Sequence, residues 1–569
     1  MNCQIEVELK FLVPKNAREA IAAEMARGSS PQERRTLAAS YFDTEDRRLA
    51  RAGMAWRVRR EGRLWIQTLK AGGGSALERF EHEVIRPDAS HDPAAHAGTA
   101  VGKKLIKVLR EAQKEGVEVG VRFQTEVVRT ARRVRARGAV VEVAFDEGRV
   151  LSNESSLKIM ELEFELISGS TTAMLGLVER WRKRFGLVYD PLSKSERGDR
   201  LAEGSSFPPL RKASLPDYQG DADATAAFCA VVDECLAHIS RNSIGLVAGD
   251  PSLRVEHVHQ VRVGIRRLRS ALRSFEGWVP PPPDALTDGI RDLFATLGQA
   301  RDSDVLDSGV VAELSKVGAP PLTMPVDPAG PDPAEAVRAS KAQQLLLAWL
   351  AWRASLAERP AKVVGSASEE PRTGDGATVE QANEATAAGK EPPNPPPPQA
   401  GSQADGEEEP GSLEGSLVDH VVSVTAQGNG ETGPIPESET PTFRLEAERR
   451  LRRWHRRIAA DWKEFDSLDE ESLHSLRKRI KRQRYAVEFF GPVLKEQKTK
   501  RYLKPLTSIQ DRMGELNDLF VAKARYQKLV ESDPAAWFAL GWLAARIADV
   551  RALAKPELKR LAKANPPVH

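Results

Sequence analysis

Residues 5–10 read IEVELK, and in this stretch charged residues alternate with apolar ones. A β-strand points successive side chains to opposite faces, so Glu6, Glu8 and Lys10 share one face and the apolar residues take the other. Many antiparallel strands bury an apolar face and leave a charged face in water. The stretch therefore predicts a strand with one charged face, and it leaves open whether that face is solvated or binds a ligand.

The same alternation recurs through residues 1–203, between turn-like Gly, Asp or Asn sites. The clearest segments are GMAWRVRR (53–60), RLWIQTLK (63–70), RFEHEVI (79–85), GAVVEVAFDEG (138–148) and IMELEFELISG (159–169). Helical patterns interrupt them near 16–27, 101–115 and 171–186. Several short strands spaced in this way predict an antiparallel sheet or barrel with flanking helices.

The charged faces of these segments carry both acidic and basic residues. They hold Arg57, Arg59, Lys70, Arg79, Glu81, Glu83, Arg129, Glu142, Asp146, Glu161, Glu163 and Glu165. One interpretation is a sheet whose outer face of mixed charge is solvated. The other is a closed sheet with the charges inside, which is costly unless a ligand pairs them. A polyphosphate with divalent cations would pair both kinds, because carboxylates bind Mg²⁺ or Mn²⁺ and Arg and Lys bind phosphate. The alternation does not decide between the two.

The composition argues for a soluble protein without a dominant charge. Lys and Arg number 84 and Asp and Glu 81, so the formal net charge of +3 implies no global attraction to nucleic acid or membrane. The three cysteines show no metal-ligand spacing and no disulfide framework, as is typical of a reducing compartment. No secretory signal is recognisable at the N-terminus, and the most apolar stretch, 345–352, is too short to span a bilayer. We expect a cytoplasmic protein with no membrane partner.

The second part of the chain has helical rather than strand periodicity. Residues 204–220, rich in Pro, Gly and Ser, read as a linker, and helices are predicted at 222–245, 255–276, 285–315, 334–358, 443–465, 468–493, 499–531 and 534–563. A low-complexity block at 360–442 divides this helical part. It has few aromatic residues and cannot bury enough apolar surface to fold, so it predicts a disordered insertion.

Two similar stretches in the helical part place a histidine and three basic residues at positions 0, 3, 7 and 10. HQVRVGIRRLR begins at His259 and HSLRKRIKRQR begins at His474. These positions lie on one face of an α-helix. A single basic face is commonly solvated, but a repeated one indicates a duplicated helical bundle. The two stripes are His259, Arg262, Arg266 and Arg269, and His474, Arg477, Lys481 and Arg484.

The first 203 residues resemble a CYTH domain of the triphosphate tunnel metalloenzyme family, whose hallmark is an ExExK strand. Its motifs occur here in order: Glu6, Glu8 and Lys10; Arg57 and Arg59; Lys70; Arg79, Glu81 and Glu83; Arg129; Glu161 and Glu163; Lys194 and Arg197. The resemblance implies an α+β fold, with an eight-stranded antiparallel tunnel that binds a triphosphate end-on and hydrolyses a phosphoanhydride with Mg²⁺ or Mn²⁺.

The same resemblance assigns expected roles to these residues. Metal ligation is expected for Glu6, Glu8, Glu161 and Glu163, assisted by Glu81, Glu83 and Asp146. Catalytic contacts to phosphate are expected for Lys10, Arg57, Arg59, Lys70 and Arg129, with further substrate contacts from Arg79, Lys194 and Arg197. Glu142 and Glu165 are expected behind these ligands or at the rim. Inorganic triphosphate is the favoured substrate, because CYTH domains fused to a helical partner resemble bacterial inorganic triphosphatases.

The helical part resembles a CHAD domain, through both His/Arg stretches and through RDSDV at 301–305. The resemblance implies an all-α duplicated bundle that binds polyphosphate through the two stripes, and a protein that could associate with polyphosphate granules. The predicted domains are CYTH at 1–203, a linker at 204–220, CHAD halves at 221–359 and 443–569, and the insertion at 360–442 between them.

Alternatives are a non-catalytic polyphosphate-binding protein, or a CYTH enzyme acting on thiamine triphosphate or, as in class IV adenylate cyclases, on ATP. Acidic residues spread through the basic helices argue against a nucleic-acid partner.

Overall fold

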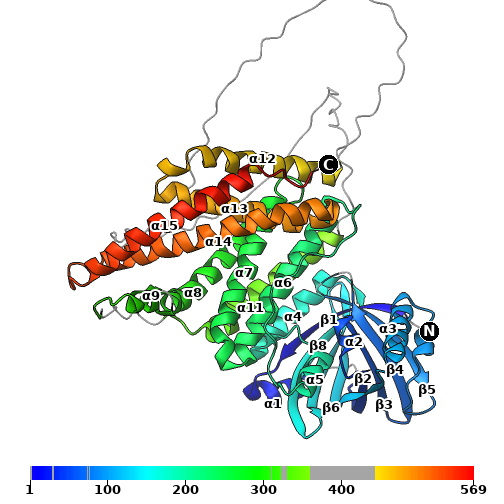
Figure 1. Cartoon of the computed structure of the whole chain (residues 1–569). Coiled ribbons are helices and arrows are strands. Elements are labelled where there is room, and N and C mark those ends of the chain that lie inside the picture. The colour runs from blue at the N-terminus through cyan, green and yellow to red at the C-terminus, as the bar shows by residue number, and fades with distance from the viewer. Residues whose placement is uncertain are drawn as a thin grey trace, which may run out of the picture. The chain divides into compact units, whose positions relative to one another are not determined.

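The N-terminal strands of the computed structural model form a closed antiparallel barrel (Figure 1). The order is β5-β4-β3-β2-β6-β7-β8-β1, and β1 also pairs with β5, which closes the ring. A two-residue strand, β9 (Val188–Tyr189), adds to β1. The eight long strands are β1 (Cys3–Leu12), β2 (Glu33–Thr44), β3 (Met54–Glu61), β4 (Leu64–Gly72), β5 (Glu78–Arg86), β6 (Val119–Ala136), β7 (Ala139–Ser152) and β8 (Ser155–Gly169). The prediction of an eight-stranded antiparallel barrel is confirmed.

The structure describes residues 3–27, 31–73, 75, 77–308, 310–321, 330–358 and 442–568, without the side chains of 3, 4 and 299–308. The predicted disordered insertion at 360–442 lies outside the described residues except for Thr442. Residues 301–305, the RDSDV segment, are described as helix, but their side chains lie outside the described set. The predicted domain boundaries therefore stay predictions.

Apolar side chains cover the outside of the barrel, and this places the charged faces inside. Along β8, Leu162 and Phe164 are fully buried on the outer face, between neighbouring strands and the helix α4 (Thr171–Phe185). The Phe164 ring meets Phe11 of β1 and Trp181 of α4 edge to face, with ring centroids 5.7 and 5.9 Å away. Of the two interpretations of the charged faces, the closed sheet with inward charges is correct.

Four other α-helices accompany the barrel. They are α1 (Arg18–Met25), α2 (Arg48–Arg51), α3 (Ala100–Lys114) and α5 (Lys194–Ala202). The helix patterns predicted near 16–27, 101–115 and 171–186 correspond to α1, α3 and α4. Helix α5 was not predicted as a helix, although it carries the Lys194 and Arg197 segment. It begins with a capping box, in which Ser193 and Glu196 accept each other's backbone N–H groups.

The region after the linker is entirely helical in the described residues. Its helices are α6 (Ala224–Ala248), α7 (Arg254–Ser274), α8 (Asp284–Ser308), α9 (Val310–Lys316), α10 (Pro333–Arg338), α11 (Ser340–Glu358), α12 (Phe443–Lys463), α13 (Glu470–Phe489), α14 (Glu496–Gln527) and α15 (Ala536–Ala562). Short 3₁₀ helices lie at Lys15–Ala17, Pro93–His96, Pro251–Leu253, Phe465–Ser467 and Gly491–Val493. Among the described residues, no helix combines the length and apolar character needed to cross a bilayer.

One cluster of buried apolar residues runs from part of the barrel into the helical region, within a single compact unit. On the barrel side it includes Val178 and Trp181 of α4, and on the helical side it includes Trp349 and Leu350 of α11. A shared core of this kind resists rearrangement, because separation of the two parts would return its apolar surface to water.

Helix α5 packs against the barrel without room for one more methyl group. A Cβ at Gly198 would lie 2.1 Å from the Phe123 ring of β6. By contrast, a Cβ at Gly176 of α4 would meet nothing within 4 Å. The two glycines therefore make a matched pair.

We expect Gly198→Ala to lower the free energy of unfolding by about 1–3 kcal/mol, because the ring or the helix must move. Gly176→Ala should raise it by about 0.5–1 kcal/mol, because alanine loses less conformational freedom in a helix. Thermal unfolding of both variants beside the wild type measures the difference. Equal shifts in the two variants would contradict the tight packing of α5.

Candidate functional site: a charged cavity in the barrel

The barrel encloses a cavity of about 880 Å³ whose wall is formed largely by charged side chains. Most residues predicted for the site lie on this wall, contributed by β1, β3–β8 and α5. They are Glu6, Glu8, Lys10, Arg57, Arg59, Lys70, Arg79, Glu81, Glu83, Arg129, Asp146, Glu163 and Lys194. Glu161 and Arg197 are not part of the lining. Glu161 is 2% exposed behind it, and Arg197 bonds to Asp190, which is also buried.

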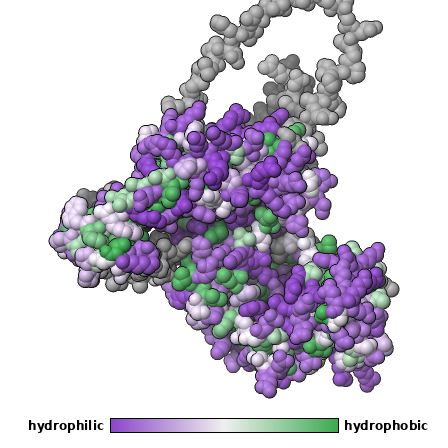
Figure 2. All heavy atoms as spheres, in the orientation of Figure 1, coloured by the Kyte–Doolittle hydropathy of each residue, from purple (hydrophilic) through white to green (hydrophobic). Residues whose placement is uncertain are grey.

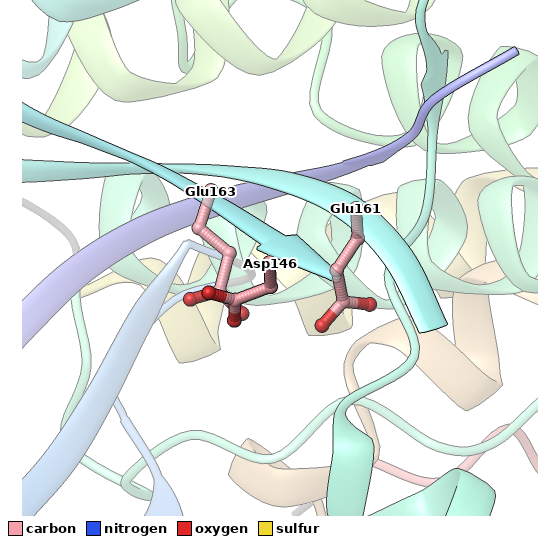
Figure 3. A group of neighbouring side chains, drawn as sticks. All are labelled: Asp146, Glu161 and Glu163. Atoms are coloured by element: carbon pink, nitrogen blue, oxygen red, sulfur yellow. The ribbon is translucent and has the colours of Figure 1, made fainter. Parts of the chain in front are cut away.

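Three carboxylates from β7 and β8 converge on one side of the cavity (Figure 3). Oxygen atoms of Asp146, Glu161 and Glu163 lie within 4.8 Å of one another. The Lys194 ammonium contacts all three, at 2.6 Å from Asp146 and 2.7 Å from Glu163. We call these three carboxylates the β7–β8 triad.

Three cations neutralise the β7–β8 triad. Besides Lys194, Arg129 donates two hydrogen bonds to Asp146 at 2.8 and 2.7 Å and also bonds Glu163, and Lys10 lies 3.6 Å from Glu161. Burial alone would raise the pKa of Glu163, but Lys194 and Arg129 hold that pKa well below its usual range. Asp146, whose pKa Lys194 and Arg129 also lower, and Glu163 are therefore ionised, and three cations surround the triad.

A second set of carboxylates has too few cations. Lys70 lies 2.8 Å from Glu6 and 3.0 Å from Glu81. Glu8 is close enough to Glu6 to act on it electrostatically. Burial raises the pKa of Glu6 to about 8 against the pull of Lys70, with Glu8 and Glu81 adding to the rise. Burial also disfavours the charge on Glu81, yet Lys70 and a hydrogen bond from Glu6 bring that pKa to about 2. Glu6 and Glu81 therefore share one proton.

Glu165 extends this uncompensated negative charge along β8. Burial, with Glu142, Glu81 and Glu8 nearby, raises the pKa of Glu165 to about 7, although Lys70 opposes the rise. Both Glu142 and Glu165 line the cavity, so they are part of its wall and do not stand behind it.

Another part of the wall is cationic and comes from β3. The Arg57 Nη1 donates to the Tyr41 hydroxyl at 3.2 Å, and its Nη2 lies 3.9 Å from Glu81. Arg59 pairs with Glu61 and lies 3.5 Å from Glu83. Both guanidinium groups line the cavity, and their planar arrays of N–H donors are suited to bind phosphate oxygens.

Two further site residues were missed from the sequence. Asp190 is 1% exposed, accepts from Arg197 at 2.5 Å and lies 4.0 Å from Lys10. Tyr41 is buried on β2 and orients Arg57. A usable signal for Asp190 is its position just before the PLSKSERG segment, whereas an isolated tyrosine on a strand gives none.

The residues present fit a divalent cation. The β7–β8 triad offers converging oxygens, but Lys194 already occupies the space between them. The set around Glu6, Glu8 and Glu81 has excess negative charge that protonation of Glu6 relieves. A hard cation such as Mg²⁺ or Mn²⁺ prefers carboxylate oxygens and would relieve that excess instead.

In the helical region the two basic stripes lie on helices that pack together, α7 and α13. Val261 and Leu476 are fully buried on other faces of these helices, whereas the stripe residues are only partly buried, and His474 is exposed. Arg266 is close enough to Arg477 and Lys481 to act on them electrostatically. Burial, together with Arg477 and Arg266, lowers the pKa of Lys481 to about 7. Cations of both stripes are thus gathered where mutual repulsion opposes them.

Other residues of the two stripes contact neighbouring groups of the protein. Arg262 donates to the Gly298 carbonyl at 3.3 Å and lies over the Phe294 ring. His474 hydrogen-bonds Asn517 at 3.0 Å, and Arg484 donates to Glu488 at 2.8 Å. His259 and Arg269 are half-buried on the same face of α7. Figure 2 shows hydrophilic residues over much of the neighbouring surface of α12 and α13.

Two family models match the chain. The model of the CYTH domain matches residues 4–198, and that of the CHAD domain matches residues 230–527. The chain belongs to the CHAD family and carries an N-terminal CYTH domain. CYTH enzymes are metal-dependent, and the family includes triphosphatases.

Individual relatives are distant. An inorganic triphosphatase of Haemophilus influenzae is 28% identical over 162 residues, which are 28% of this chain and 45% of that protein. The match therefore spans less than half of the relative's length. Among solved structures, the CHAD domain of the plant Ricinus communis matches 63% of this chain and 98% of its own, with 25% identity and a TM-score of 0.38. A putative adenylyl cyclase from Hippeastrum, described as having a dominant triphosphatase activity, matches 34% and 94%, with 18% identity and a TM-score of 0.26.

The shared proton of the CYTH barrel predicts a pH dependence of stability. The pKa of Glu6 rises from 4.5 to about 8 on folding. At a pH between these two values, the folded barrel therefore holds a proton that the unfolded chain has lost. The contribution of Glu6 to the free energy of unfolding of metal-free protein should therefore fall as pH rises from about 5 to 8. Glu6→Gln should remove this contribution and change the slope relative to the wild type, because an amide needs no proton.

Urea unfolding of chelator-treated protein across this pH range measures the effect. Glu126→Gln removes a carboxylate that is exposed and outside the cavity, and this variant should keep the wild-type slope. An unchanged slope in Glu6→Gln would contradict the shared proton.

Proposed function

We propose that the CYTH barrel hydrolyses inorganic triphosphate with Mg²⁺ or Mn²⁺, and that the CHAD region binds polyphosphate. The observation that carries the first part is the composition of one cavity wall. It combines the carboxylates around Glu6, which hold a proton, with the guanidinium groups of Arg57 and Arg59, which line the same cavity. A divalent cation can take the place of that proton, and the phosphate oxygens of a triphosphate can bind the guanidinium groups.

The chain's own residues suggest a division of labour. Lys10, Arg57, Arg59, Lys70 and Arg129 would bind phosphate oxygens and stabilise the charge that develops as the phosphoanhydride breaks. Glu6, Glu8, Glu81 and Glu163 would hold the cation, with Glu83, Asp146 and Glu161 in support. Such a cation neutralises phosphate charge and lowers the pKa of a bound water. Tyr41 and Asp190 would orient Arg57 and Lys10, because each contacts one of these side chains.

Arg79 and Lys194 would contribute further contacts to the phosphate, since both line the cavity. Arg197 faces Asp190 instead, so we assign it to holding that carboxylate in place. The choice of inorganic triphosphate rests on the distant similarity to the Haemophilus influenzae protein. Thiamine triphosphate and ATP are the competing substrates.

Replacement of the first carboxylates should abolish turnover. We expect Glu6→Ala/Glu8→Ala to reduce kcat/KM for triphosphate by about 100-fold or more, because the cation loses its ligands. Phosphate release from triphosphate, thiamine triphosphate and ATP with Mg²⁺ or Mn²⁺ measures both activity and substrate preference.

Glu118→Ala/Glu126→Ala is the matched control, because both residues are exposed and neither lines the cavity. Full activity of Glu6→Ala/Glu8→Ala would refute the assignment of the metal ligands. Faster release from another substrate would replace inorganic triphosphate, and absence of all turnover would leave a polyphosphate-binding protein.

The observation that supports polyphosphate binding is the gathering of Arg266, Arg477 and Lys481 from two helices on one accessible face. A long polyanion relieves the repulsion among these cations and releases its own counterions, so its affinity should depend strongly on salt.

We expect the glutamine variant of Arg262, Arg266, Arg477 and Lys481 to bind polyphosphate at least ~10-fold more weakly and with a smaller salt dependence. The control replaces the exposed Arg449, Arg452, Arg453 and Arg456 of α12, which removes as many charges elsewhere. Titration at several salt concentrations, with duplex DNA as competitor, measures both effects. Equal losses in the two variants would indicate that net charge alone governs binding.

A further inference from the structure

Lys194 enters the barrel on a short segment, residues 188–202, that contacts the CHAD region on its other side. The segment consists of β9, a turn and α5. On the barrel side, the N–H of Asp190 donates to the Lys10 carbonyl at 2.8 Å, and the Lys194 ammonium contacts the β7–β8 triad. The placement of one cavity cation therefore depends on how this segment is held.

Two buried contacts attach the start of the segment to CHAD helices. The Gln343 side chain of α11 accepts a hydrogen bond from the Tyr189 N–H at 2.8 Å and donates to the Val337 carbonyl at 2.8 Å. Ile244 of α6 packs with Val188 and Leu192 in a small buried apolar cluster. These contacts fix the backbone that leads into α5.

A third contact holds the first turn of α5 itself. One oxygen of Glu196 accepts from the Ser193 N–H at 2.9 Å and from its hydroxyl at 3.0 Å, which closes the capping box around Lys194. The other oxygen binds Arg241 of α6 at 2.6 Å. A single carboxylate thus connects the turn that carries Lys194 to a CHAD helix.

The CHAD helices also form part of the cavity wall. Ala237, Ser240 and Arg241 lie on one face of α6, at the spacing i, i+3 and i+4, and all three line the cavity. Leu346 and Leu350 of α11 line it as well. The barrel's cavity is therefore completed by the neighbouring region of the chain.

We propose that the CHAD region positions Lys194 in the barrel through the contact between Arg241 and Glu196, so that the triphosphatase site is complete only when both regions are present. Arg241 and Glu196 are positioning residues in this proposal. The part of it that concerns turnover rests on the proposed function. The positioning of Lys194 beside the triad does not.

A direct contact between Arg241 and substrate is the competing explanation, since Arg241 lines the cavity. The two explanations differ in the effect of Glu196. If Arg241 positions α5, loss of either partner releases the same turn, and the two variants behave alike. If Arg241 binds phosphate, loss of Glu196 frees its guanidinium, and the two variants behave in opposite ways.

Steady-state kinetics of full-length Glu196→Gln, Arg241→Gln and the double variant with triphosphate separates these explanations. We expect kcat/KM to fall about tenfold in each single variant and no further in the double variant, because both remove one interaction. Glutamine can still cap α5, so the loss reports on the contact with Arg241. Arg241→Lys should recover part of the activity, because it keeps a cation beside Glu196. A rise in KM in Arg241→Gln alone would overturn the proposal.

The matched control is Arg353→Gln, which should retain wild-type activity. Arg353 of α11 pairs with a carboxylate of α6, Asp233, at 2.5 Å and does not line the cavity, and this ion pair does not involve α5. Thermal unfolding of all variants shows that they are folded. Loss of activity in Arg353→Gln equal to that in Arg241→Gln would also overturn the proposal.

Mn²⁺ binding without substrate, measured by calorimetry, tests the positioning independently of turnover. A displaced Lys194 leaves the triad with uncompensated negative charge, so Glu196→Gln and Arg241→Gln should both bind Mn²⁺ more tightly than the wild type. A simple effect of charge predicts tighter binding for Arg241→Gln and weaker binding for Glu196→Gln, and that result would overturn the proposal. If the wild type hydrolyses no triphosphate, the proposed function fails, and the Mn²⁺ comparison still decides the positioning.

Discussion

Confinement of many charges inside a closed barrel is the constraint on which the rest of the structure depends. Once β1 pairs with both β5 and β8, every charged strand face points at the same cavity, and each carboxylate must find a cation, a proton or a ligand. The β7–β8 triad finds three cations. The carboxylates around Glu6 have Lys70 and the more distant Arg57 as cationic partners, and they hold a proton. This unequal division creates a place for an external cation on one side of the cavity.

The same constraint explains why the barrel needs covering from outside. Inward charges leave the apolar residues of each strand on the outer surface, and these must be buried by helices. Helix α4 covers β8 through Trp181 and also belongs to the apolar core that continues into α11. Burial of the outer strand faces therefore both closes the barrel around its cavity and joins the two regions of the chain.

The helical region also brings like charges together, in this case cations on the surface of two helices. Helices α7 and α13 each bury one face and expose a stripe of cations, and their packing brings Arg266 near Arg477 and Lys481. Burial, together with repulsion from Arg477 and Arg266, lowers the pKa of Lys481, although Asp518 opposes the shift. A surface that keeps these cations together despite their repulsion is suited to long anions. The cavity of the barrel could accept such an anion only by one end.

The period-two alternation in IEVELK and its later counterparts was sufficient to place the strands and to assign residues such as Glu8 and Lys10 to one face, because side-chain direction along a strand is local geometry. Helical spacing likewise placed His259 with Arg266 and His474 with Lys481 on accessible helix faces. The sequence thus determined most of the elements, although not β2 or α5, and it identified the charged strand residues that line the cavity.

Tertiary structure alone decided which charges pair. Glu6 and Lys70 are 64 positions apart, and Lys194 meets Asp146 and Glu163 only because α5 folds back against the barrel. Tyr41, Asp190 and Arg241 carry no local pattern that marks them, since their roles depend on partners from other elements. Strand alternation fixes where a side chain points, whereas its protonation and its partner depend on distances across the closed barrel, which no local pattern contains.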